Sequence, residues 1–390
     1  MKPTEFVKVN SQFWGEHLKG VSGHLPVSHS RELVGPLLYP RQLVLTETPD
    51  WNILELVGVT REYRSLEVRR QKAAGIDEYF GATGAGKPVV RLSNDTLYQD
   101  TTIATEYGNG VLTAGFPTAQ RLTLSELIGT ADIGDGQLLK FAPGNYTALQ
   151  RVLLTSSLGT SVRVHWAFLA IAIHRSEPAD KYRDYLQGLV NAAPHLDPVG
   201  TAAVPRGGVE KLLKAAPFAS TYQHSLGKTT VGDFLQQHEE VLLAAFDATQ
   251  LIREPVLDGQ DSSPDFILER SDGTHILGEL ALPLLETAKD GKKRRRSIAT
   301  QDGAARLAQY GEYFGNAENR EFAKTKYGVE VSEPRKVLVT GNQDLTTIPE
   351  SKTPLELVDY DTLLRLSLAP KASAASTTDA ISSVTILGQQ

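Results

Sequence analysis

The sequence predicts an α/β protein of two domains, and three observations support this. The chain has 390 residues, whereas a single hydrophobic core rarely serves more than about 250–300. Hydrophobic residues make up 41% and charged residues 22% of the chain, which is typical of globular proteins. Short β-like runs and turns dominate the first half, and helical and β-like patterns alternate in the second. We therefore expect a mixed N-terminal domain, followed by a C-terminal domain with a central mixed sheet flanked by helices.

The N-terminal half, residues 1–195, gives short β-like runs separated by Gly and Pro clusters, for example at 43–45, 53–57 and 161–164. This pattern favours a mixed or β-rich domain. Residues 196–228 are rich in Pro, Gly and Ala, as expected for a connector between domains. No chemical motif is evident before the connector, so we expect residues 1–195 to form a regulatory or sensing domain of unknown type.

The C-terminal region, residues 229–370, has a clearer pattern of elements. Thr230 and Asp233 resemble a capping box with Asp in place of Glu, and the apolar residues that follow share one helical face. The expected elements, in order, are a helix over 230–246, strands over 265–270 and 274–282 joined by a turn at 271–273, a helix over 298–314 and a strand over 335–340. Residues 371–390 have the composition of a disordered tail.

Composition excludes several classes of protein. The chain has no cysteine, which removes disulfides, thiolate metal sites and cysteine nucleophiles and suits a reducing cytoplasm. The first residues lack the apolar core of a signal peptide, and the longest apolar run, 166–173, is too short to span a bilayer. We therefore expect a cytoplasmic protein with no membrane partner. The net charge of −6 means that any binding of nucleic acid depends on a local basic patch.

Two carboxylates of the expected hairpin are candidates for a metal site. Asp265 follows Pro264 at the start of the first strand, and Glu279 lies in the second strand. Because a short hairpin places its strands side by side, both carboxylates can reach one point. Mg²⁺ takes one or two carboxylates, together with waters and substrate phosphate. Asp265, Glu279 and the backbone carbonyl of Leu280 are therefore candidate ligands for Mg²⁺ or Mn²⁺, which can activate water against a phosphodiester.

Residue 281 is the third candidate catalytic position. Side chains alternate along a strand, so residue 281 points to the same face as Glu279. A lysine there would lie beside the metal and orient or deprotonate the attacking water. The chain has Ala281, which can do neither.

These residues give the sequence a resemblance to a known family. Pro264-Asp265, thirteen further residues and then Glu279-Leu280-Ala281 resemble a PD-(D/E)xK signature whose last letter is changed. The flanking residues narrow the resemblance to the nuclease domain of Shedu anti-phage defence proteins. They are Asp233-Phe234-Leu235, Glu279-Leu280-x-Leu282-Pro283, Arg306-Leu307-x-x-Tyr310-x-x-Tyr313-Phe314 and Pro334-Arg-Lys-Val337-Leu-Val-Thr340-Gly341.

The resemblance implies a PD-(D/E)xK restriction-endonuclease-like domain that cuts double-stranded DNA in bacterial anti-phage defence. It also implies a homo-oligomer, with a tetramer as the expected assembly, and metal held by Asp265 and Glu279. Ala281 departs from the pattern, so we expect this chain to be an inactive or lysine-knockout form of the enzyme. Three explanations stay open: an engineered substitution, natural loss, or a lysine that has migrated elsewhere. The two retained carboxylates favour the first. The alternative function is a non-catalytic DNA-binding or scaffold protein that retains the fold.

A basic run follows the second strand of the hairpin. Residues 289–296 hold six basic residues and one acid. Such a run is a solvated loop, a localisation signal or a phosphate-binding patch, and its place after the metal-site strand favours phosphate contact, which positions DNA without reading its sequence. The expected DNA-binding residues are Lys292, Lys293, Arg294, Arg295 and Arg296. His275 lies in the same hairpin, and we expect it to pack or face solvent rather than bind metal.

Overall fold

The computed structural model describes the chain in separate ranges. The described residues are 1–24, 39–58, 60, 63–75, 89–92, 101–104, 147–158, 161–191, 218, 221–222, 228–281, 297–341 and 355–368. These residues form two compact units, and each unit has its own buried core. Together they give a mixed α/β protein, as the sequence predicts.

The two units do not divide the chain at a single point. The first contains residues 1–156, 166–216 and 370–390, and the second contains residues 157–165 and 217–369. The short segment 157–165 was assigned to the N-terminal domain on sequence grounds, but it belongs to the second unit because residues 162–164 pair with a strand of that unit.

The first unit is built on a sheet whose longest strand is the most apolar run of the chain. β1 (Gln42–Glu47) pairs antiparallel with β2 (Trp51–Val57) and parallel with β3 (Glu67–Lys72). β2 pairs antiparallel with the later part of β7 (Ser161–His174), in which residues 166–173 are all buried. Three further strands are β4 (Val89–Leu92), β5 (Thr101–Ala104) and β6 (Thr147–Leu158). The β-like runs expected at 43–45, 53–57 and 161–164 are thus strands.

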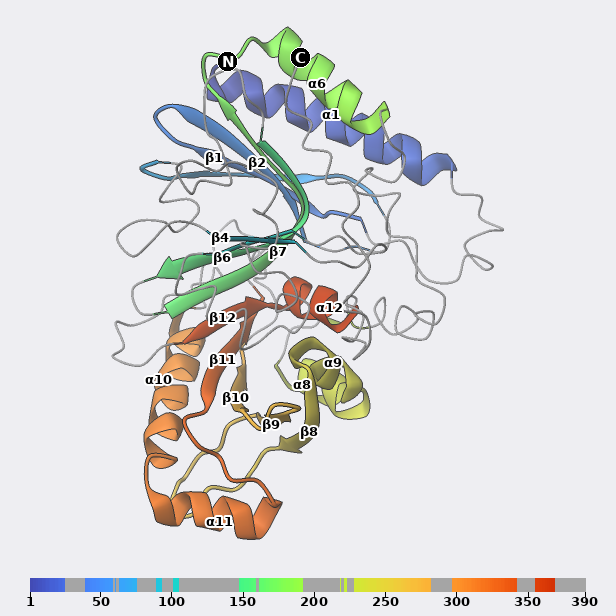
Figure 1. Cartoon of the computed structure of the whole chain (residues 1–390). Helices are drawn as coiled ribbons and strands as arrows, with labels where there is room; N and C mark the ends of the chain where they lie inside the picture. The colour runs from blue at the N-terminus through green and yellow to red at the C-terminus, as the bar shows by residue number, and fades with distance from the viewer. Residues whose placement is uncertain are drawn as a thin grey trace, which may run out of the picture. The chain divides into compact units, whose positions relative to one another are not determined.

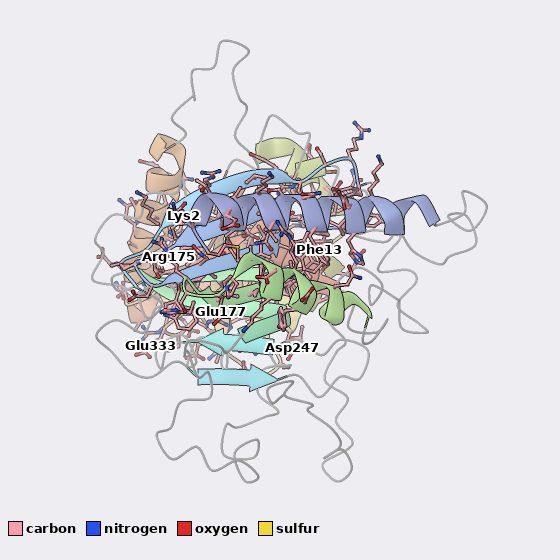
Figure 2. The ribbon with its side chains drawn as sticks, turned by 90° about the horizontal axis from the view of Figure 1, so that it is seen from above. Lys2, Phe13, Arg175, Glu177, Asp247 and Glu333 are labelled. Atoms are coloured by element: carbon pink, nitrogen blue, oxygen red, sulfur yellow. The ribbon has the colours of Figure 1, made fainter. Side chains whose placement is uncertain are left out.

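Two helices of the first unit, α1 (Pro3–His24) and α6 (Ala179–Asn191), pack against each other. The rings of Phe6 and Tyr182 lie 5.4 Å apart, and the Tyr182 hydroxyl donates to Asn10 Oδ1 at 2.8 Å. Figure 2 shows the two helices side by side, with Phe13 on α1 and with Arg175 and Glu177 at the turn that leads into α6. The 22-residue helix α1 was not expected from the sequence.

The second unit has a mixed sheet in which four neighbouring strands run parallel. β8 (Ala248–Arg253), β9 (Phe266–Arg270) and β10 (His275–Leu280) form an antiparallel meander. β10 then pairs parallel with β11 (Arg335–Thr340), β11 with β12 (Glu356–Asp359), and β12 with residues 162–164 of β7. All six residues of β10 are buried, which is typical of a strand that is covered on both faces.

Helices cover both faces of this sheet. α10 (Ser297–Tyr313) packs along β10 and β11, while α9 (Glu240–Phe246) and α12 (Tyr360–Leu368) pack together on the other side (Figure 1). Two further helices are α8 (Lys228–Gln237) and α11 (Ala317–Tyr327). The expected central mixed sheet flanked by helices is therefore present in this unit.

The expected helix over 230–246 is wrong in its continuity. The chain forms two helices, α8 and α9, separated at His238 and Glu239, and α9 ends where Asp247 adopts a left-handed conformation with a φ of 52°. Most of the apolar residues expected on one face are buried, including Val231, Leu235 and Phe246, while Phe234 is half-buried.

The described residues include no helix that is both long enough and apolar enough to cross a membrane. The connector 196–228 and the tail 371–390 lie almost entirely outside the described residues.

Candidate functional site

The hairpin that carries the candidate carboxylates forms as the sequence predicts. β9 and β10 pair antiparallel, with His275 opposite Glu269 and Gly278 opposite Phe266. The turn is closed by Asp272, whose Oδ1 accepts the backbone N–H of Thr274 at 3.0 Å, and by Gly273 at a φ of 77°. A φ of that sign favours glycine, so the Asp-Gly pair explains why the chain reverses here.

Close packing between the two strands fixes their register. A Cβ added to Gly278 would lie 1.9 Å from the Phe266 ring, so the ring occupies the space that any side chain at 278 would need. Because alternate residues face opposite sides of a strand, this arrangement turns Leu277, Glu279 and Ala281 to the other face, where α10 packs.

Asp265 is held directly against the second strand. Its backbone N–H donates to the Gly278 carbonyl at 3.0 Å, and its Oδ2 accepts the backbone N–H of Leu280 at 2.6 Å. The N–H and C=O groups of one strand residue point to the same side of the strand. The carbonyl of Leu280 therefore points toward the side on which the Asp265 carboxylate lies, as required of a shared ligand set.

Glu279 is a buried carboxylate that pairs with a cation from α10. Its side chain is 2% exposed, and its Oε2 accepts from Nη2 of Arg306 at 2.8 Å. The Arg306 side chain is 37% exposed. The hydrogen bond to Glu279 raises the pKa of Arg306 against the opposing effect of burial, and the charge of Asp265 adds to the rise. Thus Arg306 lies within the field of both carboxylates.

Two residues of α10 bring the helix close to Glu279. A Cβ on Gly303 would lie 3.0 Å from Leu338 Cδ1 and 4.0 Å from Glu279 Cβ, so the missing side chain permits a close approach of helix and sheet. Tyr310 follows Arg306 by one helical turn and is buried. Burial raises the pKa of its hydroxyl, and the charges of Glu279 and Asp265 add to the rise. Ser262 lies close to this hydroxyl, although not in regular hydrogen-bond geometry.

Ala281 lies at the end of β10 with both of its backbone groups bonded. Its N–H donates to the Val339 carbonyl at 2.7 Å, and its carbonyl accepts from the Tyr360 hydroxyl at 2.8 Å. The side chain is 6% exposed and belongs to the apolar cluster that includes Leu277 and Ala304. The expected placement of residue 281 on the same face as Glu279 therefore agrees with the cluster in which it packs.

The donor set of this site suits Mg²⁺ better than a more demanding ion. Asp265 and Glu279 are two hard carboxylates on adjacent strands, and Mg²⁺ needs only one or two together with water and phosphate. Within the described part of the chain, no group of three or more His, Asp or Glu side chains is arranged to hold a metal. Asp265 and Glu279 could therefore hold a hydrated Mg²⁺ or Mn²⁺.

Several predicted residues lie elsewhere or beyond the described residues. The basic loop, including Lys292, Lys293, Arg294, Arg295 and Arg296, is outside the described ranges, so its proximity to the site remains a prediction. His275 is buried, its Nε2 has no hydrogen-bond partner within the described ranges, and burial lowers its pKa. Lys336 lies on β11 against Gly311, further along α10 than Arg306, and burial lowers its pKa.

Three residues of the site have no role that the sequence predicts: Arg306, Tyr310 and Tyr360. Arg306 and Tyr310 are separated by four residues in a helix, a spacing that places them on one face. That spacing indicates a shared surface but does not say which strand the surface meets. Tyr360 reaches Ala281 from the start of α12, a contact that depends on the pairing of distant strands.

No protein-family model matches the chain, and no curated protein matches it. The site is therefore defined by its own geometry.

Proposed function

We propose that the second unit is the catalytic domain of a metal-dependent DNA endonuclease with a PD-(D/E)xK-type fold, used in anti-phage defence as in Shedu proteins. The observation that supports this best is the presence of both carboxylates beside the end of β10. Asp265 Oδ2 accepts the N–H of Leu280, the residue that directly follows the buried Glu279. The family and the activity both rest on this hairpin and on the residues around it.

The proposed chemistry is hydrolysis of a phosphodiester bond, in which one water adds across a P–O bond to give a phosphate monoester and an alcohol. Asp265, Glu279 and the Leu280 carbonyl would hold a divalent ion, which would supply a water of lowered pKa and neutralise charge on the phosphate. The chain itself keeps the geometry rigid, since Tyr360 bonds to the Ala281 carbonyl and Leu280 to Asp265.

A second candidate is a non-catalytic DNA-binding or scaffold protein that has kept this fold. It is favoured by Ala281, whose methyl group packs in an apolar cluster and cannot move a proton. The retention of both Asp265 and Glu279 beside the end of β10 favours the nuclease instead.

The assembly and the role of the first unit are further parts of the proposal. Following the resemblance, we propose a homo-oligomer, specifically a tetramer, that acts on double-stranded DNA in the bacterial cytoplasm. The first unit restrains or directs the nuclease. Light scattering of the purified chain tests the assembly, because a monomer mass would remove the tetramer from the account.

The activity is tested by nicking of supercoiled plasmid at a high protein concentration. We expect slow nicking with Mn²⁺ or Mg²⁺ that stops with EDTA and is absent in Glu279→Gln. Equal nicking by Glu279→Gln would identify a contaminant. Absence of nicking, together with metal-independent binding of DNA, would favour the non-catalytic candidate.

A further inference from the structure

We propose that Arg306 contacts a phosphate of the DNA backbone beside the two carboxylates and is thus a substrate-binding residue of the site. The inference rests on the proposed function and extends it, because neither the hairpin signature nor the basic loop includes this residue.

The ion pair between Glu279 and Arg306 is unevenly buried. The Glu279 side chain is 2% exposed and that of Arg306 is 37% exposed, although the two meet at 2.8 Å. The carboxylate is therefore inside and the guanidinium is at the surface. A ligand that approaches this end of β10 from solvent meets the arginine before it meets Glu279.

The ion pair with Glu279 uses only part of the hydrogen-bond donors of Arg306. A guanidinium carries five N–H donors in a planar fork, and the bond from Nη2 to Glu279 Oε2 uses one of them. Such a fork matches two oxygens of a phosphate, a geometry that adds both energy and direction. The remaining donors belong to a side chain that is 37% exposed.

Helix α10 holds Arg306 in place. Gly303, one turn before it, lies against Glu279 and Leu338. Tyr310, one turn after it, is buried, and its hydroxyl has no regular hydrogen bond within the described ranges while it lies in the field of Asp265 and Glu279. Arg306 is therefore carried by a well-packed helix, and an incompletely bonded donor lies next to it.

Arg306 provides positive charge beside the two carboxylates on the face of the sheet that α10 covers. Ala281 supplies none, and Lys336 packs against Gly311, two helical turns beyond Gly303. Two carboxylates repel a phosphate unless positive charge lies close by. Arg306 provides that charge at the carboxylates themselves, independently of the basic loop.

The alternative is that Arg306 serves only as the counterion that offsets the cost of burying Glu279. Binding of a short DNA duplex and of Mn²⁺ to the full chain separates the two roles. The variants are Arg306→Gln, Arg306→Lys and the control Lys324→Gln, which removes one positive charge from an exposed ion pair on α11. DNA affinity is measured with Ca²⁺ from 50 to 200 mM salt, and Mn²⁺ affinity by calorimetry without DNA.

For a phosphate contact we expect Arg306→Gln to weaken DNA binding at least about tenfold, as for loss of a charged hydrogen bond. The salt slope should fall by about 0.9, so that the loss of affinity over this salt range becomes about threefold smaller. Arg306→Lys keeps the charge and the slope but loses the fork. In Arg306→Gln, Mn²⁺ affinity stays equal or rises because a competing cation is gone. Lys324→Gln changes none of these values.

An unchanged salt slope in Arg306→Gln, with DNA and Mn²⁺ still bound, would overturn the inference and leave the proposed function intact. A joint fall of thermal stability and Mn²⁺ affinity at constant slope would identify a counterion only, and would also overturn it. If the unsubstituted chain binds neither duplex DNA nor Mn²⁺, the proposed function itself fails.

Discussion

Ala281→Lys is the substitution that most directly probes the missing member of the site. Residue 281 lies two residues after Glu279 on the same strand face, so the two Cα atoms are about 6.6 Å apart at about 3.3 Å per residue. A lysine side chain can span that separation, and the backbone at 281 is already fixed by its bonds to Val339 and Tyr360. The amine can therefore reach the Glu279 carboxylate without movement of the strand.

The expected gain and the expected cost can both be estimated. A positioned general acid or base typically contributes about 10²–10⁴ in rate, so Ala281→Lys should raise Mg²⁺-dependent cleavage at least about a hundredfold. Because Ala281 is 6% exposed in an apolar cluster, the longer side chain should cost about 1–3 kcal/mol of stability. The variant should thus cut faster although it melts at a lower temperature.

The assay is cleavage of linear and supercoiled DNA with Mg²⁺ or Mn²⁺, with melting curves to confirm folding. Ala281→Met is the matched control, because it adds similar length without an amine and should give no gain. Glu279→Gln in the lysine variant should cancel the gain. A folded Ala281→Lys protein that cuts no better than Ala281→Met would refute the missing-lysine explanation and favour the non-catalytic candidate.

Three further predictions follow from the hairpin and the loop beside it. Gly278→Ala should cost more than about 2 kcal/mol of stability by overpacking, because its Cβ would fall 1.9 Å from the Phe266 ring. Combining it with Phe266→Leu should recover part of that loss, as measured by chemical denaturation in a double-mutant cycle. Burial lowers the pKa of His275 below its ordinary 6.5. As the pH drops below about 6.5 the unfolded chain therefore takes up this proton first, and the free energy of unfolding should fall. His275→Gln should flatten that part of the pH profile of stability, and an unchanged profile would contradict the burial of His275. Serine at all five positions 292–296 should weaken duplex binding and flatten the salt slope by about 0.9 per lost phosphate contact, whereas an unchanged slope would mean a solvated loop.

Local patterns explain which parts of the fold were predictable from sequence. The hairpin was predicted because its turn residues and its apolar strands are adjacent in the chain, and β9 and β10 form as expected. α10 and β11 were predicted within a residue or so for the same reason. α1 was not predicted, although its buried Phe6, Trp14 and Leu18 are separated by eight and four residues, a spacing that places them on one helical face.

Long-range pairing explains what was not predictable. β12 pairs with residues 162–164, which lie about 190 positions earlier, and no local signal reports such a partner. The contact between Arg306 and Glu279 likewise depends on where α10 crosses the sheet, which a helical period cannot specify. Asp265 and Glu279 could be predicted as a pair because both lie in one hairpin, and their role stays a prediction.

Metal binding by Asp265 and Glu279 is the central claim, and calorimetry with Mn²⁺ tests it most directly. We expect one ion per chain, and we expect both Asp265→Asn and Glu279→Gln to abolish binding while the protein stays folded. Glu330→Gln removes one carboxylate charge from an exposed ion pair on the surface and should bind as the unsubstituted chain does. Equal binding of Mn²⁺ by all four proteins, or binding by none of them, would contradict the account.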